Sequence, residues 1–325
     1  MTGHRTPVRG VALFMTRRLS GTLLLLVVIS FLVFCLLYLE PGDIARNLLG
    51  TRQVTPQTLA EVRAQYHLED PLPLQYWTWL TNAMHGDFGI SVRTQDPVAH
   101  MITSRLGLTI EMVVISFVLA MVGGIPAGVW AAVRRNQVLD RAVVGSSVVF
   151  ISAPAFALGL LLLYVFAQAL GWFPVYGTGV GTFDRLWHLA LPSLTLALGL
   201  GAFIVKITRA AVIHELEQDY VVFARARGLA ARQTLALAMR NAAIPVLTSL
   251  GLAVAYLFGS TILVEATFSL PGLGSLLEDS VLFKDIPTVQ ALTLLVAAVI
   301  AVTALLVDLT YLLFDPRLRT QLVSR

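Results

Sequence analysis

The stretch HELEQDYVVFARARGLAARQTLALAMRNAAIP, residues 214–245, is a charged insert between two long uncharged segments of a very apolar chain. Glu215, Glu217 and Asp219 stand where a helix would begin. Arg225 and Arg227 follow in what would be its last turn. Negative charge near the amino terminus of a helix and positive charge near its carboxyl terminus both suit the helix dipole. The order of charges therefore predicts a short helix in the first half of the insert.

Gly228 follows that helix at a position where a left-handed residue is favoured, and glycine adopts this conformation at the least cost. The segment 230–240 is rich in helix formers, with Leu235 and Met239 four residues apart, and 241–245 leads into the next apolar run. We predict an exposed helical elbow that can transmit force between membrane helices and a cytosolic partner. An ordinary basic loop held at lipid head groups would explain the same residues.

The composition indicates lipid as the solvent. Of the 325 residues, 57% are hydrophobic and only 13% are charged, against roughly 25% charged in soluble domains. Nucleic acid is not expected as a partner, because the basic residues lie beside apolar runs and are not interleaved with exposed aromatic residues. The single cysteine, Cys35, excludes a disulfide within the chain and is interpreted as a small apolar side chain.

Six charge-free runs predict six transmembrane helices. The first run covers about 30 Å at about 1.5 Å per residue, which matches the hydrocarbon thickness of a bilayer. It is too long for a typical signal core and lacks a small-residue cleavage site, so we expect it to remain as a membrane anchor. The six runs are residues 19–39, 112–133, 142–169, 189–205, 242–264 and 288–307.

Basic residues predict the orientation. With the amino terminus inside, 16 of the 23 Lys and Arg residues fall on the cytosolic side, as the positive-inside rule requires. The fold class expected is an all-α polytopic membrane protein with both termini in the cytosol. Its predicted parts are a cytosolic tail (1–18), the first span (19–39), an outer loop (40–106), a five-helix core (107–314) with the cytosolic loop 206–241, and a cytosolic tail (315–325).

The outer loop is predicted to contain two short helices. Thr55 suits a helix cap and Pro56 the first helical position, and Leu59, Val62 and Tyr66 then share one face. A second helix carries the apolar residues Leu74, Trp77, Leu80 and Met84, and the indole rings of Trp77 and Trp79 suit a membrane interface.

Two segments predicted on the outer side have turn chemistry. The first is HGDFGIS, residues 85–91, and the second is EATFSLPGLG, residues 265–274. They suit either a surface on which another protein docks or a lid that only covers the helix bundle. The candidate docking or outer-gate residues are Gly86, Asp87, Phe88, Pro271, Gly272 and Gly274.

Small residues four apart indicate close helix packing in a membrane. Gly124 and Gly128 continue a stripe of small residues from Ser116 and Ala120 in the second span, and the fifth span has a similar stripe. We interpret both stripes as static packing and not as gates. Hydroxyl groups in the third and fourth spans suit either an aqueous path or hydrogen bonds to their own backbone. The fifth-span stripe is Gly251, Ala255 and Gly259.

The run DYVVFARARGL, residues 219–229, followed by RNAAIP, residues 240–245, resembles the coupling loop of dipeptide/oligopeptide/nickel-type permeases of ABC importers. The turn 86–91, the segment 265–274 and the tail Asp308, Tyr311 and 315–317 resemble the same family in the same order. No Glu-Ala-Ala triplet precedes Gly228, which departs from the general importer loop and matches the peptide-permease variant. The residues implied in docking on an ATPase are Asp219, Tyr220, Phe223, Ala224, Arg225, Ala226, Arg227, Gly228 and Leu229.

That resemblance implies a type I ABC importer permease in a prokaryotic inner membrane. It also implies a second permease of similar fold as a heterodimer partner, two ATP-binding subunits that hold ATP and Mg, and an extracytoplasmic substrate-binding protein. The chain itself is expected to bind no cofactor. A dipeptide, an oligopeptide, glutathione, a nickel complex and a sugar all remain possible cargoes.

Other chemistry is missing from the sequence. Lys never follows Gly, so the chain has no phosphate-binding loop of the ATPase type. A zinc-protease motif at His214 fails because Gln218 stands where the second ligand should be, and neither a catalytic nor a metal site is predicted. Ion-coupled secondary transport is the alternative function and a channel comes third. The ionisable residues that such transport would use, Glu111, Lys206, Glu265 and Asp308, fall near span ends, where structural or snorkelling roles are expected.

Overall fold

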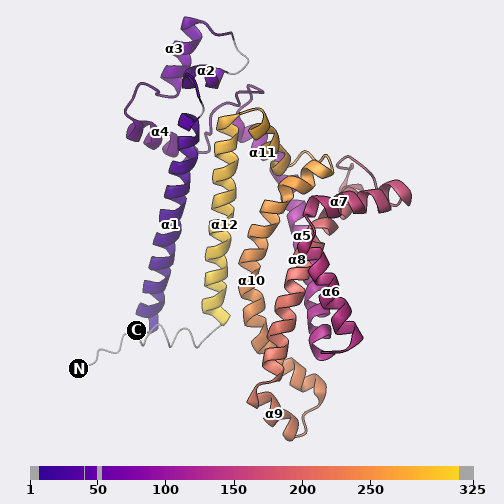
Figure 1. The fold of residues 1–325 in the computed structure, drawn as a ribbon. Helices are drawn as coiled ribbons and strands as arrows, with labels where there is room; N and C mark the ends of the chain where they lie inside the picture. The colour runs from indigo at the N-terminus through magenta and orange to yellow at the C-terminus, as the bar shows by residue number, and fades with distance from the viewer. Residues whose placement is uncertain (1–6, 40, 50–52, 315–325) are drawn as a thin grey trace, which may run out of the picture. The chain divides into compact units, whose positions relative to one another are not determined.

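The computed structural model describes residues 7–39, 41–49 and 53–314, and within them it contains helices and no strand (Figure 1). An isolated β-bridge joins Ile90 to Pro97. The chain divides into two compact units. The first is built on Ile110–Leu270 and the second on Arg17–Thr109 with Pro271–Ala301.

The second unit contains most of α1 (Pro7–Leu39) and several short helices. These are α2 (Ile44–Leu49), α3 (Pro56–Gln65), α4 (Leu72–Met84) and α11 (Leu273–Leu282), together with the first part of α12 (Ile286–Phe314). The predicted start of α3 is confirmed, because Thr58 N–H donates to Thr55 Oγ1 over 3.1 Å and Pro56 takes the first helical position. A buried core among α1, α2 and α3 contains Leu37, Leu48, Leu49 and Val62.

The predicted helix α4 is also confirmed, but its apolar stripe is not what packs. Trp77 is 63% exposed and Met84 is 78% exposed. The buried face instead carries Gln75, which accepts a hydrogen bond from Tyr38, and Tyr76, whose hydroxyl lies 2.7 Å from Ser30 Oγ. Polar and aromatic side chains therefore attach α4 to α1.

The first unit is organised around α8 (Thr182–Leu216), whose side chains are buried along most of its length. The helices α6 (Val138–Ser152), α7 (Ala155–Leu162) and α10 (Ala231–Thr267) all contact it. The later part of α5 (Val98–Val133) belongs to the same unit. Short helix α9 (Asp219–Ala226) lies in the turn between α8 and α10 (Figure 1).

Four helices are long and apolar enough to cross a membrane: α1, α5, α8 and α12. Two bent pairs raise the number to six if each counts as one span: the two halves of α10, bent by 45°, and α6 with Ala155–Ala169, bent by 107°. The uncharged run 142–169 is therefore not one straight helix. Ala153 is extended before Pro154, since the proline ring disfavours helical conformation in the preceding residue. After the bend, α7 continues into the π-helix η1 (Leu163–Ala169).

Candidate functional site

The charged insert folds as the predicted elbow. Helix α8 ends at Leu216, α9 follows, and α10 begins at Ala231 and continues through Pro245. One detail of the prediction is wrong: Glu215 lies in the last turn of α8 and Glu217 is its C-cap, so of the three acids only Asp219 begins α9. Gln218 is extended and separates α8 from α9, so Glu215 and Glu217 lie before this break and not at the start of α9.

Gly228 ends α9 in the predicted left-handed conformation, with φ +79°. Its N–H donates to the carbonyl of Arg225 over 2.9 Å, and Leu229 N–H donates to the carbonyl of Ala224 over 3.2 Å. These two bonds form a Schellman motif, which satisfies the last carbonyls of the helix. A side-chain carbon at Gly228 would meet nothing within 4 Å, so glycine is required by conformation and not by space.

The two faces of α9 differ. Val221 and Ala224 are buried against the neighbouring helices, whereas Val222 is 54% exposed and Phe223 is 68% exposed. Arg225, Ala226 and Arg227 are also exposed. The elbow thus presents apolar side chains beside two positive charges. Val222 is not among the residues that the resemblance implied, although its position next to Phe223 on a short helix could have indicated it.

Local contacts fix the elbow on its unit. The hydroxyl of Tyr220 donates to Glu215 Oε2 over 2.6 Å. Burial of the hydroxyl is the larger cause, and this hydrogen bond the smaller one, of a pKa of Tyr220 above its usual value. Arg135, in the turn after α5, forms an ion pair with Glu217. At the start of α10, Leu235 and Met239 pack on a buried cluster from α5, α8 and α10: Ala132, Ala211, Val212 and Ala242. Of the three helices of this cluster, α8 and α10 contact α9 directly.

The stripe on α5 lies against α8. A side-chain carbon added at Gly124 would come within 2.9 Å of the carbonyl oxygen of Gly201, and one at Gly128 within 2.8 Å of that of Val205. Only glycine permits such close backbones. On α10, a carbon at Gly259 would meet nothing within 4 Å, and Ala255 is half-buried. The surroundings of Gly251 lie outside the residues described.

The hydroxyls of the third and fourth spans mostly bond their own helices. Ser147 Oγ donates to Val143 over 2.7 Å and Thr195 Oγ1 donates to Leu191 over 2.8 Å. Of the two interpretations left open by the sequence, backbone bonding is thus the one seen at these positions.

An ion pair between a buried carboxylate and a partly exposed arginine joins α6 to α8 and was missed by sequence reasoning. Arg209 Nε and Nη2 donate to the two carboxylate oxygens of Asp140 over 2.6 and 2.8 Å. Asn136 N–H donates to the same carboxylate over 2.8 Å. The available signal was an acid in the first turn of a helix, since such acids often accept backbone N–H bonds.

In the second unit, the turn 85–91 and the last residues of the segment 265–274 meet at one cluster. Phe88 packs against a buried group that includes Leu273, Leu276 and Leu292. Gly86 has φ +85°, and Asp87 Oδ1 accepts a hydrogen bond of 3.0 Å from Gly89 N–H. Of the other candidates, Pro271 is exposed, while Gly272 and Gly274 are buried at the start of α11.

Asp285 holds the first of these turns and was not singled out from sequence. Its carboxylate accepts bonds from Ser91 Oγ over 2.5 Å, Val92 N–H over 3.0 Å and Thr288 Oγ1 over 2.8 Å. The sequence Asp285-Ile286-Pro287-Thr288 carried a signal, because Asp before a proline in the first helical turn is typical of a cap.

Ionisable residues of the long helices occupy different settings. Glu111 is half exposed and pairs with Arg185. Glu265 is 0% exposed, so of the two roles expected for it, snorkelling is excluded and a structural role remains. Among the described residues, no group of three or more His, Cys, Asp or Glu side chains could hold a metal ion.

Comparison with known proteins gives two family matches. Residues 124–320 match the family described as binding-protein-dependent transport system inner membrane component, and residues 11–113 match its N-terminal domain. The chain is 40% identical over 307 residues to the glutathione transport system permease protein GsiC of Escherichia coli K12, covering 94% of this chain and 98% of that protein. It is 36% identical over 313 residues to the probable peptide ABC transporter permease protein y4tP of Sinorhizobium fredii, covering 95% of this chain and 100% of that one.

Both matches extend over nearly the whole length of the chain, in agreement with the resemblance carried by residues 86–91, 219–229 and 265–274. The chain therefore belongs to the inner-membrane permease components of binding-protein-dependent ABC transport systems.

Proposed function

We propose that this chain forms half of the translocation path of an ATP-driven importer for peptides or a similar small solute. The observation that carries the proposal is the elbow: a short helix locked by Gly228 that presents Val222 and Phe223 beside Arg225 and Arg227. Exposed apolar residues rimmed by charge are typical of a protein–protein contact. A cytosolic ATPase subunit is the partner this surface serves.

The mechanism requires four kinds of subunit. This chain pairs with a second permease of similar fold, two ATP-binding subunits hold ATP and Mg, and an extracytoplasmic binding protein delivers the solute. Closure of the ATPase subunits pushes α9, and the cluster beneath it carries the movement to α5, α8 and α10. The path then alternates between inward-facing and outward-facing states, and hydrolysis resets it.

The topology proposed is six crossings with both termini in the cytosol. Helix α6 has 15 residues, or about 22 Å, which is short for a bilayer of about 30 Å, so α6 with α7 and η1 counts as one broken crossing. Labelling with a membrane-impermeant maleimide tests the orientation. In a Cys35→Ser background, Met84→Cys should react in intact cells and Val222→Cys only in inside-out vesicles.

Ion-coupled secondary transport is the second candidate, and one observation favours it. Glu265 is fully buried in α10, which could cross the membrane as one bent span, and buried ionisable groups within membranes commonly serve proton or ion pathways.

The test of the first candidate is purification of the tagged chain from its native host in mild detergent, with identification of bound proteins by mass spectrometry. We expect a second permease and two ATPase subunits in stoichiometric amounts. Phe223→Ser should release the ATPase subunits, whereas Val138→Ser, at an exposed apolar position outside the elbow, should retain them. A lone chain that drives uptake without ATP would overturn the proposal.

A further inference from the structure

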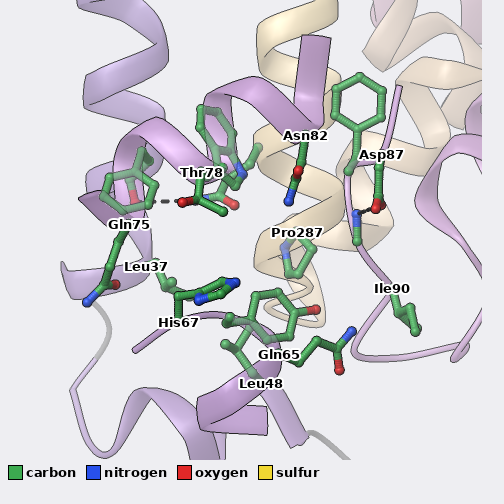
Figure 2. Close-up of a pocket in the computed structure, with 16 residues that line it drawn as sticks. Leu37, Leu48, Gln65, His67, Gln75, Thr78, Asn82, Asp87, Ile90 and Pro287 are labelled. Atoms are coloured by element: carbon green, nitrogen blue, oxygen red, sulfur yellow. Dashed lines mark hydrogen bonds between the residues drawn. The ribbon is translucent and has the colours of Figure 1, made fainter. Parts of the chain in front are cut away.

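Two hollows of the molecule differ in their walls. The cavity of about 240 Å³ in the second unit has the polar side chains Gln65, Asn82 and Asp87 in its lining, and all three are exposed (Figure 2). Exposed polar groups can bond water, so they do not require a ligand. The groove of about 570 Å³ in the first unit has mainly apolar walls, and much of this apolar surface is exposed. Contiguous apolar surface of this kind marks contact with a protein or a membrane.

The groove lies between α5 and the start of α8. Ile110 and Val114 line it from α5, and Leu186 lines it from α8. All three side chains are half-exposed. The charged residues of the lining are Glu111 and Arg185, which form an ion pair. The groove thus combines an apolar wall with a pair of charges, as a phospholipid combines acyl chains with a charged headgroup.

The loop beside this groove, residues 170–181, is held firmly on α8. A side-chain carbon at Gly179 would lie 2.6 Å from the carbonyl carbon of Asp184, and the residue has φ +72°, so glycine is needed there. Val180 N–H donates to Asp184 Oδ2 over 2.8 Å. The ring of Phe173 stacks on that of Trp187, with 4.5 Å between the ring centroids. These contacts fix the loop, so the exposure of its other side chains is a property of the fold.

Apolar side chains project from this loop and from the first turns of α8. Val180 is 93% exposed and Phe183 is 90% exposed, and the sequence has no charged residue between Arg141 and Asp184. The rim of a protein contact is normally polar, whereas Trp and Tyr are enriched where a membrane meets water. This surface therefore fits the boundary of a membrane better than a protein contact. Its exposed Trp and Tyr residues are Trp172, Tyr176 and Trp187.

Two observations place this surface at the level of the membrane boundary. Arg185 and Arg209 are 24 positions apart on α8, or about 36 Å at about 1.5 Å per residue, against about 30 Å of hydrocarbon. A carbon at Gly159 of α7 would lie 3.0 Å from the ring of Phe268, so α7 packs on the last residues of α10. Figure 1 shows α7 at the end of this unit opposite to α9. The bend of 107° after α6 then turns α7 and η1 along the boundary.

We propose that lipids of the outer leaflet bind this surface. One acyl chain lies in the groove against Ile110, Val114 and Leu186, and the exposed aromatic rings of residues 172–187 lie at the level of the headgroups. Arg185 is partly exposed and binds a headgroup phosphate, because a guanidinium and a phosphate form strong charge-assisted hydrogen bonds. The α7 and η1 part of the broken crossing lies along the same boundary. The choice of the outer leaflet rests on the topology proposed above, whereas the contact with lipid does not.

Quenching of a fluorophore by spin-labelled phospholipids tests the lipid contact. In a Cys35→Ser background, Val180→Cys and Val114→Cys are labelled separately, and the chain, purified with its bound subunits, is placed in lipid nanodiscs. Both positions are exposed, so the changes should leave the fold intact. We expect a spin label near the headgroup to quench Val180→Cys most, and one deeper in the acyl chain to quench Val114→Cys most. Val222→Cys, an exposed apolar position of the elbow, is the matched control and should be quenched several-fold less than either.

Quenching of Val180→Cys and Val114→Cys no stronger than that of Val222→Cys overturns the proposal. Quenching that appears only after the other subunits are removed also overturns it, because a protein then covers this surface in the complex. The topology is tested separately by maleimide labelling of Met84→Cys and Val222→Cys. Strong quenching with reversed labelling overturns the topology and moves the lipid contact to the other leaflet, and strong quenching without ATP-driven uptake overturns the importer alone.

Discussion

At the scale of single residues, Gly228 gives the sharpest prediction. A β-branched side chain at φ +79° is strained by roughly 1–3 kcal/mol even in open space, so Gly228→Val should displace the elbow. We expect uptake to fall several-fold while membrane insertion and expression persist. Gly145→Ala is the control, since Gly145 is helical and a carbon there also meets nothing within 4 Å. Normal uptake by the Gly228 variant would argue against a coupling role for the elbow.

The ion pair of Asp140 and Arg209 leads to a prediction on stability. Because Asp140 is buried, Arg209→Met leaves a carboxylate without its partner and should cost about 3–5 kcal/mol. We expect a clear drop in the Tm of the detergent-purified chain. Arg135→Gln breaks an exposed pair with Glu217 and should cost no more than about 1 kcal/mol. Equal Tm losses in the two variants would show that burial does not set the strength of these pairs.

Residues were predictable where their partners are local. Thr55 caps the helix that follows it, and Gly228 ends the helix before it, so both can be recognised within four positions of sequence. Asp285 bonds Ser91 from 194 positions away, and Asp140 bonds Arg209 from 69 positions away. No pattern within one element indicates such pairs, because their distance is set by the packing of separate helices.

At the scale of elements, the contact between α5 and α8 can be tested with neighbouring glycines. A methyl group at Gly128 would lie 2.7 Å from Thr208 Cβ, so Gly128→Ala should separate the helices at a cost of roughly 1–3 kcal/mol. Gly123, on the same helix, has nothing within 4 Å of an added carbon. We expect Gly128→Ala to lower the Tm of the purified chain and Gly123→Ala to leave it unchanged or raise it, since alanine favours a helix.

If both alanine variants were equally stable, close packing at this stripe would be excluded. A larger effect at Gly123 would instead place an unseen partner on that face of α5.

Membrane helices were predictable from their uncharged runs, but their breaks were not. Pro126 and Pro192 lie inside helices, Pro245 lies a few residues before the 45° bend of α10, and Pro154 coincides with a bend of 107°. Neighbouring helices and side chains can satisfy the backbone groups that a proline frees, so a proline alone does not indicate a break. The uncharged runs thus showed where the chain is apolar, but not which proline ends a helix.

At the scale of the whole molecule, the remaining question is which energy source drives transport. The elbow on α9 and the family match favour ATP, whereas a fully buried Glu265 on α10 is what an ion-coupled carrier would use. These two features belong to one unit and to adjoining elements, so the same preparation can test both. Transport by the reconstituted complex should then depend either on ATP or on the negative charge of Glu265, and not on both.

Glu265→Gln keeps nearly the same shape but cannot carry a negative charge. In an ATP-driven importer, we expect uptake by this variant to stay within about threefold of the unaltered protein, because a neutral amide can keep hydrogen bonds at a cost of roughly 1 kcal/mol or less. Uptake should still require ATP and should resist a protonophore. Glu111→Gln, at a half-exposed position paired with Arg185, controls for the loss of an acid near a span end. Loss of uptake in Glu265→Gln alone, together with abolition by a protonophore in the unaltered complex, would transfer the mechanism to ion coupling through α10.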